Sequence, residues 1–193
     1  LFRSFYLEKA ASINDDIIKL FYDQEQGGFF LYGEDGEELI MRPKDFYDGA
    51  VPSGNSAALI NMIRLSKILG RQEYMEIVDK TFNFAAEMVS RNPAAYTNLA
   101  LAYMLSENHG NEIVIAGNRF YPKVKDMLKA VNEEYMPFST VVLNDEDSVL
   151  LELIPQIKEQ KEIQGEAAAY ICHNYACSKP TVDLEEFQQL IKK

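Results

Sequence analysis

The chain has 193 residues, of which 47% are hydrophobic and 25% charged, a composition typical of one or two globular domains. Thirty acidic and nineteen basic residues give a formal net charge of −11, which disfavours nucleic acids and anionic membranes as partners. No apolar run approaches the ~20 residues that span a bilayer, and no basic segment followed by an apolar one opens the chain. We therefore expect a cytoplasmic protein. Because the chain begins at Leu1 rather than Met, we interpret it as a fragment.

The first forty residues predict a helix followed by a hairpin. A helix is expected from about Arg3 to Phe21, because apolar residues recur there at steps of three and four. This apolar stripe consists of Tyr6, Ala10, Ile13, Ile17 and Leu20. Gly27 and Gly28 end the helix, and apolar runs at 29–32 and 38–41 flank a turn that contains glycine. They predict a β-hairpin at about 28–41.

Three further helices are expected between residues 56 and 110. The irregular stretch 47–56 leads into a helix that ends at Gly70, a residue suited to a helix C-terminus. A second helix runs from about Gln72 to Ser90. Asn92 and Pro93 are typical of a helix start and open a third. The short connections make these helices antiparallel neighbours.

The pattern changes after Gly110. A short apolar strand at 112–117, a helix at 121–134 and a second strand at 138–143 outline a βαβ unit. A third strand is expected at 167–172, and Asp183 begins a final helix with a sequence that resembles a capping box. The chain therefore divides into a helical domain at 1–110 and a small α/β domain at 111–193.

Three stretches together resemble one protein family. They are Asp23-x-x-x-Gly27-Gly28-Phe29-Phe30, then Arg42-Pro43-Lys44 with the segment from Tyr47 to Ser56, and finally Ala169-Tyr170-x-Cys172-x4-Cys177-x-x-Pro180. The chain resembles the C-terminal portion of the thioredoxin-domain proteins that include the bacterial YyaL proteins and the spermatogenesis-associated relatives. The likeness extends over almost the whole chain.

The resemblance implies a fold and a setting. In this family an N-terminal thioredoxin-like domain precedes an (α/α)6 toroid that is similar to N-acylglucosamine 2-epimerases and six-hairpin glycosidases. We therefore expect a mainly α fold: a partial (α/α) toroid of antiparallel helix hairpins, with a β-hairpin and a small C-terminal α/β unit. The thioredoxin-like domain of the parent chain would be a partner. A homodimer could cover the apolar flank that a partial ring exposes.

The segment 47–56 is the candidate site, because it ends at a helix start where free backbone amides can hold an anion or a sugar hydroxyl. Asp48 is the candidate catalytic acid or base, and Arg42, Tyr47, Ser53 and Asn55 are candidate substrate contacts. These residue types also suit a tight loop before a capped helix, so a structural role stays open. The resemblance implies a carbohydrate-processing domain, either epimerase-like or glycosidase-like. The alternative is a non-catalytic binding or redox-partner module for the thioredoxin-like domain.

Cys172 and Cys177 are secondary candidates for redox chemistry. Four residues separate them, so they are not the Cys-x-x-Cys of dithiol oxidoreductases. Reduced thiols are the expected state in a cytoplasmic protein, with a reversible disulfide or a zinc site that includes His173 as alternatives. The family pattern contains both cysteines. Gly117-Asn118 does not match a phosphate-binding loop. We expect no metal and no cofactor.

Overall fold

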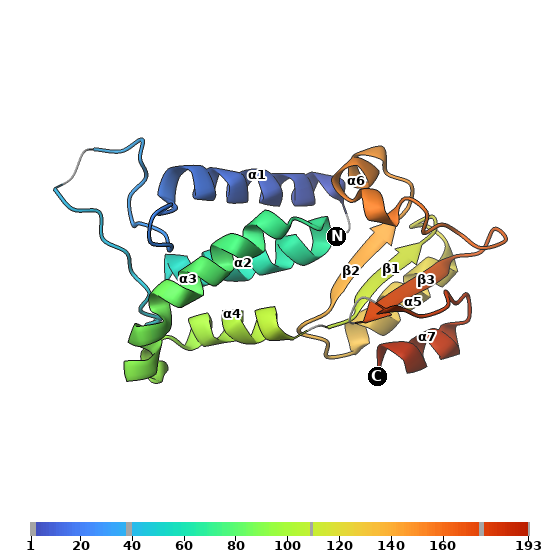
Figure 1. The fold of residues 1–193 in the computed structure, drawn as a ribbon. Coiled ribbons are helices and arrows are strands. Elements are labelled where there is room, and N and C mark those ends of the chain that lie inside the picture. The colour runs from blue at the N-terminus through green and yellow to red at the C-terminus, as the bar shows by residue number, and fades with distance from the viewer. Residues whose placement is uncertain (1–2, 38–39, 109, 174–175, 193) are drawn as a thin grey trace. The chain divides into compact units, whose positions relative to one another are not determined.

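The computed structural model describes residues 3–37, 40–108, 110–173 and 176–192. Helices account for 52% of the chain, in seven α-helices within the described part, together with a small mixed sheet of four strands. The mainly α class is thus confirmed, while the toroid stays a prediction. The chain forms two compact units (Figure 1): residues Leu7–Glu107, and the residues up to Tyr6 together with those from Asn108 onward. The described residues contain no helix long and apolar enough to cross a membrane.

The helical unit contains the four helices expected from the sequence, apart from the first three residues of α1. They are α1 (Ser4–Phe21), α2 (Gly54–Leu69), α3 (Gln72–Arg91) and α4 (Thr97–Glu107), with a 3-10 turn at Pro93–Ala95 before α4. Helix α2 packs against both α3 and α4. Its C-terminus is Gly70 in the left-handed conformation (φ 72°), whose N–H donates to the carbonyl of Ser66. The centre of this unit is fully buried and consists of Leu59, Met62, Ile63, Tyr74, Val78 and Ala102.

Helix α1 leaves most of the predicted apolar stripe exposed, at Tyr6, Ala10 and Ile13. Ala11 and Asn14 are its buried residues, whereas Ile13 is 57% exposed. Ile17 and Leu20 of the stripe are half-buried, so the stripe is covered only toward the C-terminal end of α1. A second stripe lies one position later along the helix and is apolar except at Asn14. Its buried members are Ala11 and Asn14. A helix with two adjacent apolar stripes has a broad apolar surface, and periodicity alone does not say which half is covered.

The predicted hairpin at 28–41 is replaced by isolated bridges. Phe29 pairs with Tyr22, and Phe30 pairs with Lys44. The physical reason lies at Gly27, where the φ of 85° turns the chain back along the end of α1. The segment that follows then runs beside Lys44 rather than beside residues 40–41. Residues 38 and 39 of the predicted second strand lie outside the described residues.

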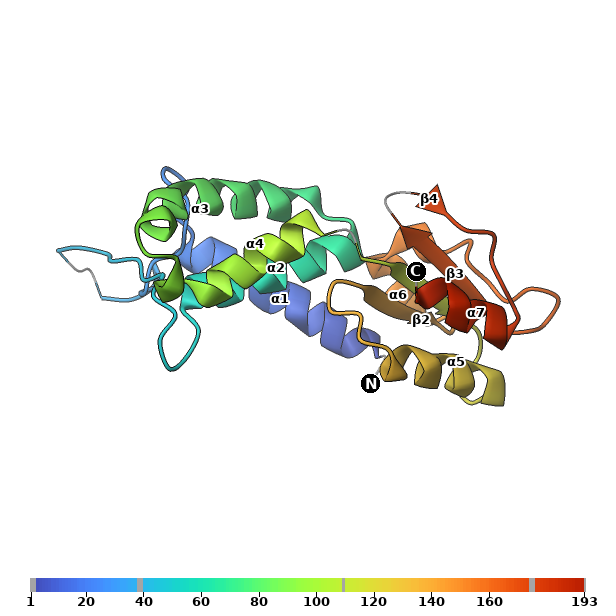
Figure 2. The ribbon, with the colours of Figure 1, turned by 90° about the horizontal axis from the view of Figure 1, so that it is seen from below.

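The second unit is a four-stranded sheet with two helices on one face. Its strands are β1 (Glu112–Ala116), β2 (Thr140–Asn144), β3 (Ala168–His173) and β4 (Ala176–Cys177), in the order β2-β1-β3-β4. Strands β1 and β2 are parallel, and β3 is antiparallel to β1 and to β4. Helix α5 (Pro122–Glu133) connects β1 to β2 as the βαβ pattern predicts, and it packs beside α7 (Leu184–Ile191), as Figure 2 shows. Helix α6 (Ser148–Leu153) was not predicted.

The core of this unit lies between the sheet and the helix pair. Its fully buried members come from β1, α5 and α7, and they include Ile113, Ile115, Val124, Met127 and Phe187. Helix α7 begins at Asp183, whose carboxylate accepts from the N–H of Glu186 at 2.8 Å, so the predicted helix start is confirmed.

Candidate functional site

Asp48 connects two helix starts within the helical unit. One carboxylate oxygen accepts from the N–H of Ser53 at 2.9 Å. The other accepts from the N–H groups of Asn98 and Leu99 at 2.8 and 3.0 Å and from the hydroxyl of Ser56 at 3.2 Å. Asn98 and Leu99 belong to the first turn of α4, where backbone N–H groups have no partner within the helix. The predicted acid therefore caps α4 and fixes the loop before α2.

Hydrogen bonding keeps Asp48 ionised. Burial alone would raise its pKa, but the donors from Ser53, Leu99, Ser56 and Asn98 together outweigh this effect and lower the pKa below its usual value. All four donors come from the protein itself. A carboxylate held in this way is a poor proton donor near neutral pH, and the arrangement favours electrostatic and structural work over acid catalysis.

Ser53 and Asn55 are both buried and both bonded within the fold. Ser53 is the N-cap of α2, and its hydroxyl oxygen accepts from the N–H of Ser56 at 3.1 Å. The amide of Asn55, which is 2% exposed, accepts from the N–H of Phe29 at 2.6 Å and donates to the carbonyls of Phe29 and Asp45. Asn55 thus holds the segment around Phe29 against the start of α2.

Arg42 and Tyr47 lie at the edge of this region. The guanidinium of Arg42 lies 4.1 Å from the ring centre of Phe30 and donates to the carbonyls of Leu20 and Tyr32. It supports the irregular segment after α1. Tyr47 is 62% exposed. The structure therefore brings Asp48 and Ser53 into direct contact and places Asn55 on the same segment, while Arg42 serves a separate set of backbone carbonyls.

A mostly apolar cavity of about 360 Å³ lies beside this segment. Its wall includes side chains from the end of α1, the segment 29–31 and the start of α2, among them Ile17, Phe21, Phe29, Phe30, Asn55 and Asn61. The aromatic side chains of this wall are Phe21, Phe29 and Phe30. Only Phe29 is fully buried, so Phe30 remains partly accessible from the cavity.

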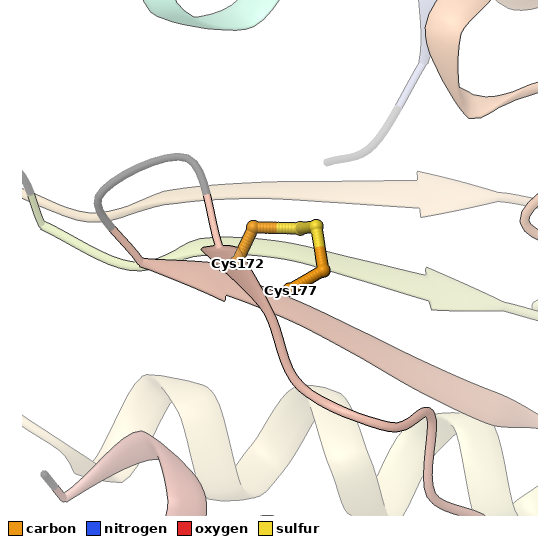
Figure 3. Close-up of a disulfide and its surroundings, with 2 residues drawn as sticks. All are labelled: Cys172 and Cys177. Atoms are coloured by element: carbon orange, nitrogen blue, oxygen red, sulfur yellow. A yellow bond between two sulfur atoms is a disulfide. The ribbon is translucent and has the colours of Figure 1, made fainter.

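The two cysteines form a disulfide between β3 and β4 (Figure 3). The expectation of reduced thiols is therefore wrong for this structure. The physical reason is register: Cys172 and Cys177 face each other as partners in the antiparallel β3–β4 ladder, which brings their Cα atoms to 3.9 Å. Cys177 is exposed and Cys172 is half-buried. His173 belongs to β3, and the described residues contain no group of three or more potential metal-binding side chains.

A polar cleft that was not predicted from the sequence lies at the carboxyl ends of β1 and β2. This cleft of about 430 Å³ is lined by Gly117, Asn118, Asn144, Asp145 and Glu162, among others. Asn144, 3% exposed, donates to the carbonyls of Ile157 and Gln160 and so holds the far wall. Asp145 pairs with Arg119. The signal in the sequence was a polar pair directly after each predicted strand, the usual place for ligands in α/β sheets.

Comparisons with known proteins place the chain within longer relatives. It is 32% identical to human Spermatogenesis-associated protein 20 over 191 residues, covering 97% of this chain and 24% of that protein. The rat protein of the same name gives the same identity and coverage, and an uncharacterised Caenorhabditis elegans protein is 25% identical over 188 residues. No family model matches. The chain thus spans about a quarter of the length of the curated relatives it matches.

Proposed function

We propose that this chain is a non-catalytic redox-partner module, whose Cys172–Cys177 disulfide accepts electrons from a dithiol protein. The thioredoxin-like domain implied by the family resemblance is the natural donor. The observation that carries this proposal is the position of the disulfide, which closes the two-residue edge strand β4 with Cys177 exposed to solvent. Exposed disulfides at sheet edges are accessible to an attacking thiolate, whereas buried ones are inert.

The topology of the unit supports a role as recipient rather than catalyst. In the order β2-β1-β3-β4, strands β1 and β2 are parallel and are joined through α5 as a βαβ unit. A Cys-x-x-Cys near such a βαβ unit is the mark of a thioredoxin-like redox site. Here the segment that follows β1, residues 117–121, contains no cysteine. The unit therefore has no attacking dithiol after β1. Its two cysteines lie instead on β3 and on the edge strand β4.

The proposed exchange proceeds in two steps. A thiolate of the donor attacks Sγ of Cys177, and the Cys177–Cys172 bond breaks with the electron pair leaving on Sγ of Cys172, which takes up a proton. The second donor thiol then loses its proton and attacks the mixed disulfide, and Cys177 leaves as a thiolate that is protonated in turn. The donor ends as a disulfide and the chain as a dithiol, with two electrons and two protons transferred.

A thioredoxin variant that keeps only its attacking cysteine tests this exchange. We expect it to form a covalent adduct with the folded chain, and peptide mapping should place the bond at Cys177. Intact reduced thioredoxin should release two thiols per chain. The Cys177→Ser variant is the control and should form no adduct through this exchange. If the disulfide is reduced only after the chain has been unfolded, the proposal is contradicted.

Carbohydrate processing is the second candidate function. The observation that favours it is the cavity lined by Phe21, Phe29 and Phe30, since sugars stack on aromatic rings. Asp48 would act as the acid or base of an epimerase-like or glycosidase-like reaction in the longer protein. Calorimetry with neutral sugars on the wild-type protein and on Asp48→Asn tests this reading. Unchanged binding and turnover in the variant would remove Asp48 from the mechanism.

A further inference from the structure

Three chain segments meet at the polar cleft of the α/β unit. Residues 117–121 follow β1, residues 144–146 follow β2, and residues 161–165 precede β3. From β1 the chain crosses to the parallel strand β2 on one side, and it then returns as β3 on the other side. Open α/β sheets bind their ligands at such a change of direction, outside the carboxyl ends of parallel strands. The position of the cleft therefore indicates a ligand site.

Hydrogen bonds within the chain hold the walls of the cleft in place. The hydroxyl of Tyr170 accepts from the N–H of Lys161 at 3.2 Å and donates to the carbonyl of the same residue at 2.7 Å. The N–H of Asn118 donates to the carboxylate of Glu162 at 3.2 Å, which links the segment after β1 to the segment before β3. The cleft of about 430 Å³ is thus formed by the chain itself, and its size lies within the ~300–1,000 Å³ of typical small-molecule sites.

Asp145 brings an unused hydrogen-bond acceptor to the wall of the cleft. One of its carboxylate oxygens pairs with the guanidinium of Arg119, while the other, Oδ1, is buried and has no hydrogen-bond partner among the described residues. Oε1 of Gln160, next to the lining residue Lys161, is buried and unpartnered in the same part of the chain. Buried acceptors are normally satisfied, and leaving one without a donor costs free energy. A ligand that donates hydrogen bonds would remove this cost.

The charges at the cleft disfavour a ligand that carries phosphate. Carboxylates outnumber ammonium groups on the wall, which includes Asp145, Glu146, Glu162 and Lys161. Like charges repel, so a phosphate would enter an unfavourable field there. The turn after β1 also lacks the glycine-rich pattern that cradles phosphates. The ligand is therefore not an anion, and it supplies hydroxyl or amino donors.

A ribose with two adjacent hydroxyl groups fits these acceptors. In dinucleotide-binding βαβ units, an acid that follows the first turn by roughly 20 residues accepts from the ribose hydroxyl. Asp145 and Glu146 occupy the corresponding position, directly after β2 and beyond the turn at Gly117. Tyr121, which is 48% exposed, adds an aromatic ring to the wall, and every base can stack on such a ring. We propose that the cleft binds a nucleoside with a free ribose diol and no phosphate.

This site is separate from the proposed redox function. Cys172 pairs with Glu112 at the start of β1, whereas the cleft lies beyond the other end of β1, at Gly117. The Cys177→Ser variant should therefore bind the nucleoside as the wild type does. Loss of nucleoside binding in a cleft variant should likewise leave thiol exchange unchanged, so the two proposals fail separately.

Calorimetry with adenosine tests the proposal. We expect one adenosine to bind per chain, and 2′-deoxyadenosine and adenosine 5′-monophosphate to bind at least about tenfold more weakly, because the first lacks one hydroxyl and the second carries a phosphate. Tyr121→Ala and Asp145→Asn should each weaken adenosine binding by about tenfold or more. The matched controls are Tyr135→Ala and Glu159→Gln, at exposed positions outside the cleft, and they should leave the affinity unchanged.

The other outcomes decide against the inference. Because Asp145→Asn also alters the pair with Arg119, circular dichroism checks its fold, and Tyr121→Ala gives a result that does not depend on that pair. No binding of adenosine at millimolar concentration would overturn the inference, and so would equal affinity of the wild type and Tyr121→Ala. Tighter binding of free ribose or of spermidine than of adenosine would also overturn it, and would identify a saccharide or an organic cation as the ligand.

Discussion

Replacing Asp48 tests whether this carboxylate holds two helix starts together. In Asp48→Ala, the backbone N–H groups of Asn98 and Leu99 lose the acceptor that caps α4. Loss of a capping side chain costs about 1–2 kcal/mol. The lost contacts to Ser53 and Ser56 add about 1–2 kcal/mol, because hydrogen bonds to an ionised acceptor are stronger than neutral ones. The free energy of unfolding should therefore fall by about 2–4 kcal/mol.

Urea unfolding followed by circular dichroism at neutral pH measures this loss. With a urea dependence of roughly 2 kcal/mol per molar, the midpoint should fall by about 1–2 M. Asp45→Ala is the matched control, because Asp45 is exposed and its carboxylate accepts a single hydrogen bond, from the N–H of Tyr47. Its midpoint should change by less than about 0.3 M. Equal midpoints for the two variants would refute the capping argument.

The pH dependence supplies a second check on Asp48. Its pKa is lowered in the folded protein, so its contribution is fully present above the pKa of the unfolded chain, near 3.8. The contribution is lost as the pH falls from there through the lower folded pKa. The stability difference between the wild type and Asp48→Asn should therefore be constant from pH 5 to 7 and shrink below pH 4. A difference that grows on acidification would show that the carboxylate is not stabilised by its donors.

Two further substitutions probe other parts of the fold. Lys44→Met removes the ammonium that lies 2.7 Å from the half-buried carboxylate of Asp23. The pKa of Asp23 is lowered to about 2, because its hydrogen bonds and the charge of Lys44 outweigh its burial. Unfolding by urea at pH 7 should show a loss of about 1–3 kcal/mol, and wild-type stability should fall as the pH drops from about 4 toward 2. Gly110→Ala would drive a Cβ into the backbone of Phe138 and should lower the thermal midpoint by several degrees. Gly54→Ala, whose Cβ meets nothing within 4 Å, should leave the midpoint unchanged or slightly higher.

Local signals in the sequence were sufficient for most element boundaries. Gly70 and Asp183 act within a single turn of helix, so their effect is visible without any tertiary contact. Pro93 instead begins a 3-10 turn, and α4 starts only at Thr97, so the predicted start of this helix was four residues too early. The alternation of strand, helix and strand after Gly110 likewise predicts a parallel pair, because the connection through α5 allows little else.

The parts that sequence analysis missed depend on residues far apart in the chain. Asp48 was a reasonable candidate acid by type and position, yet its donors include Asn98 and Leu99, fifty residues further on. The state of the cysteines depends on the register between β3 and β4, which the spacing alone does not determine. On α1, two apolar stripes lie side by side, and only the packed structure distinguishes the covered one from the open one at Ile13.

The shortness of β4 has a consequence for the behaviour of the protein in solution. A two-residue strand offers almost no backbone ladder that a neighbouring molecule could extend, and the sulfur cross-link ties it to β3. The same hairpin thereby shields the inner strand from intermolecular pairing. Reduction would loosen this cover and leave part of β3 open to cross-β association, so a reducing environment should make the protein more prone to aggregate.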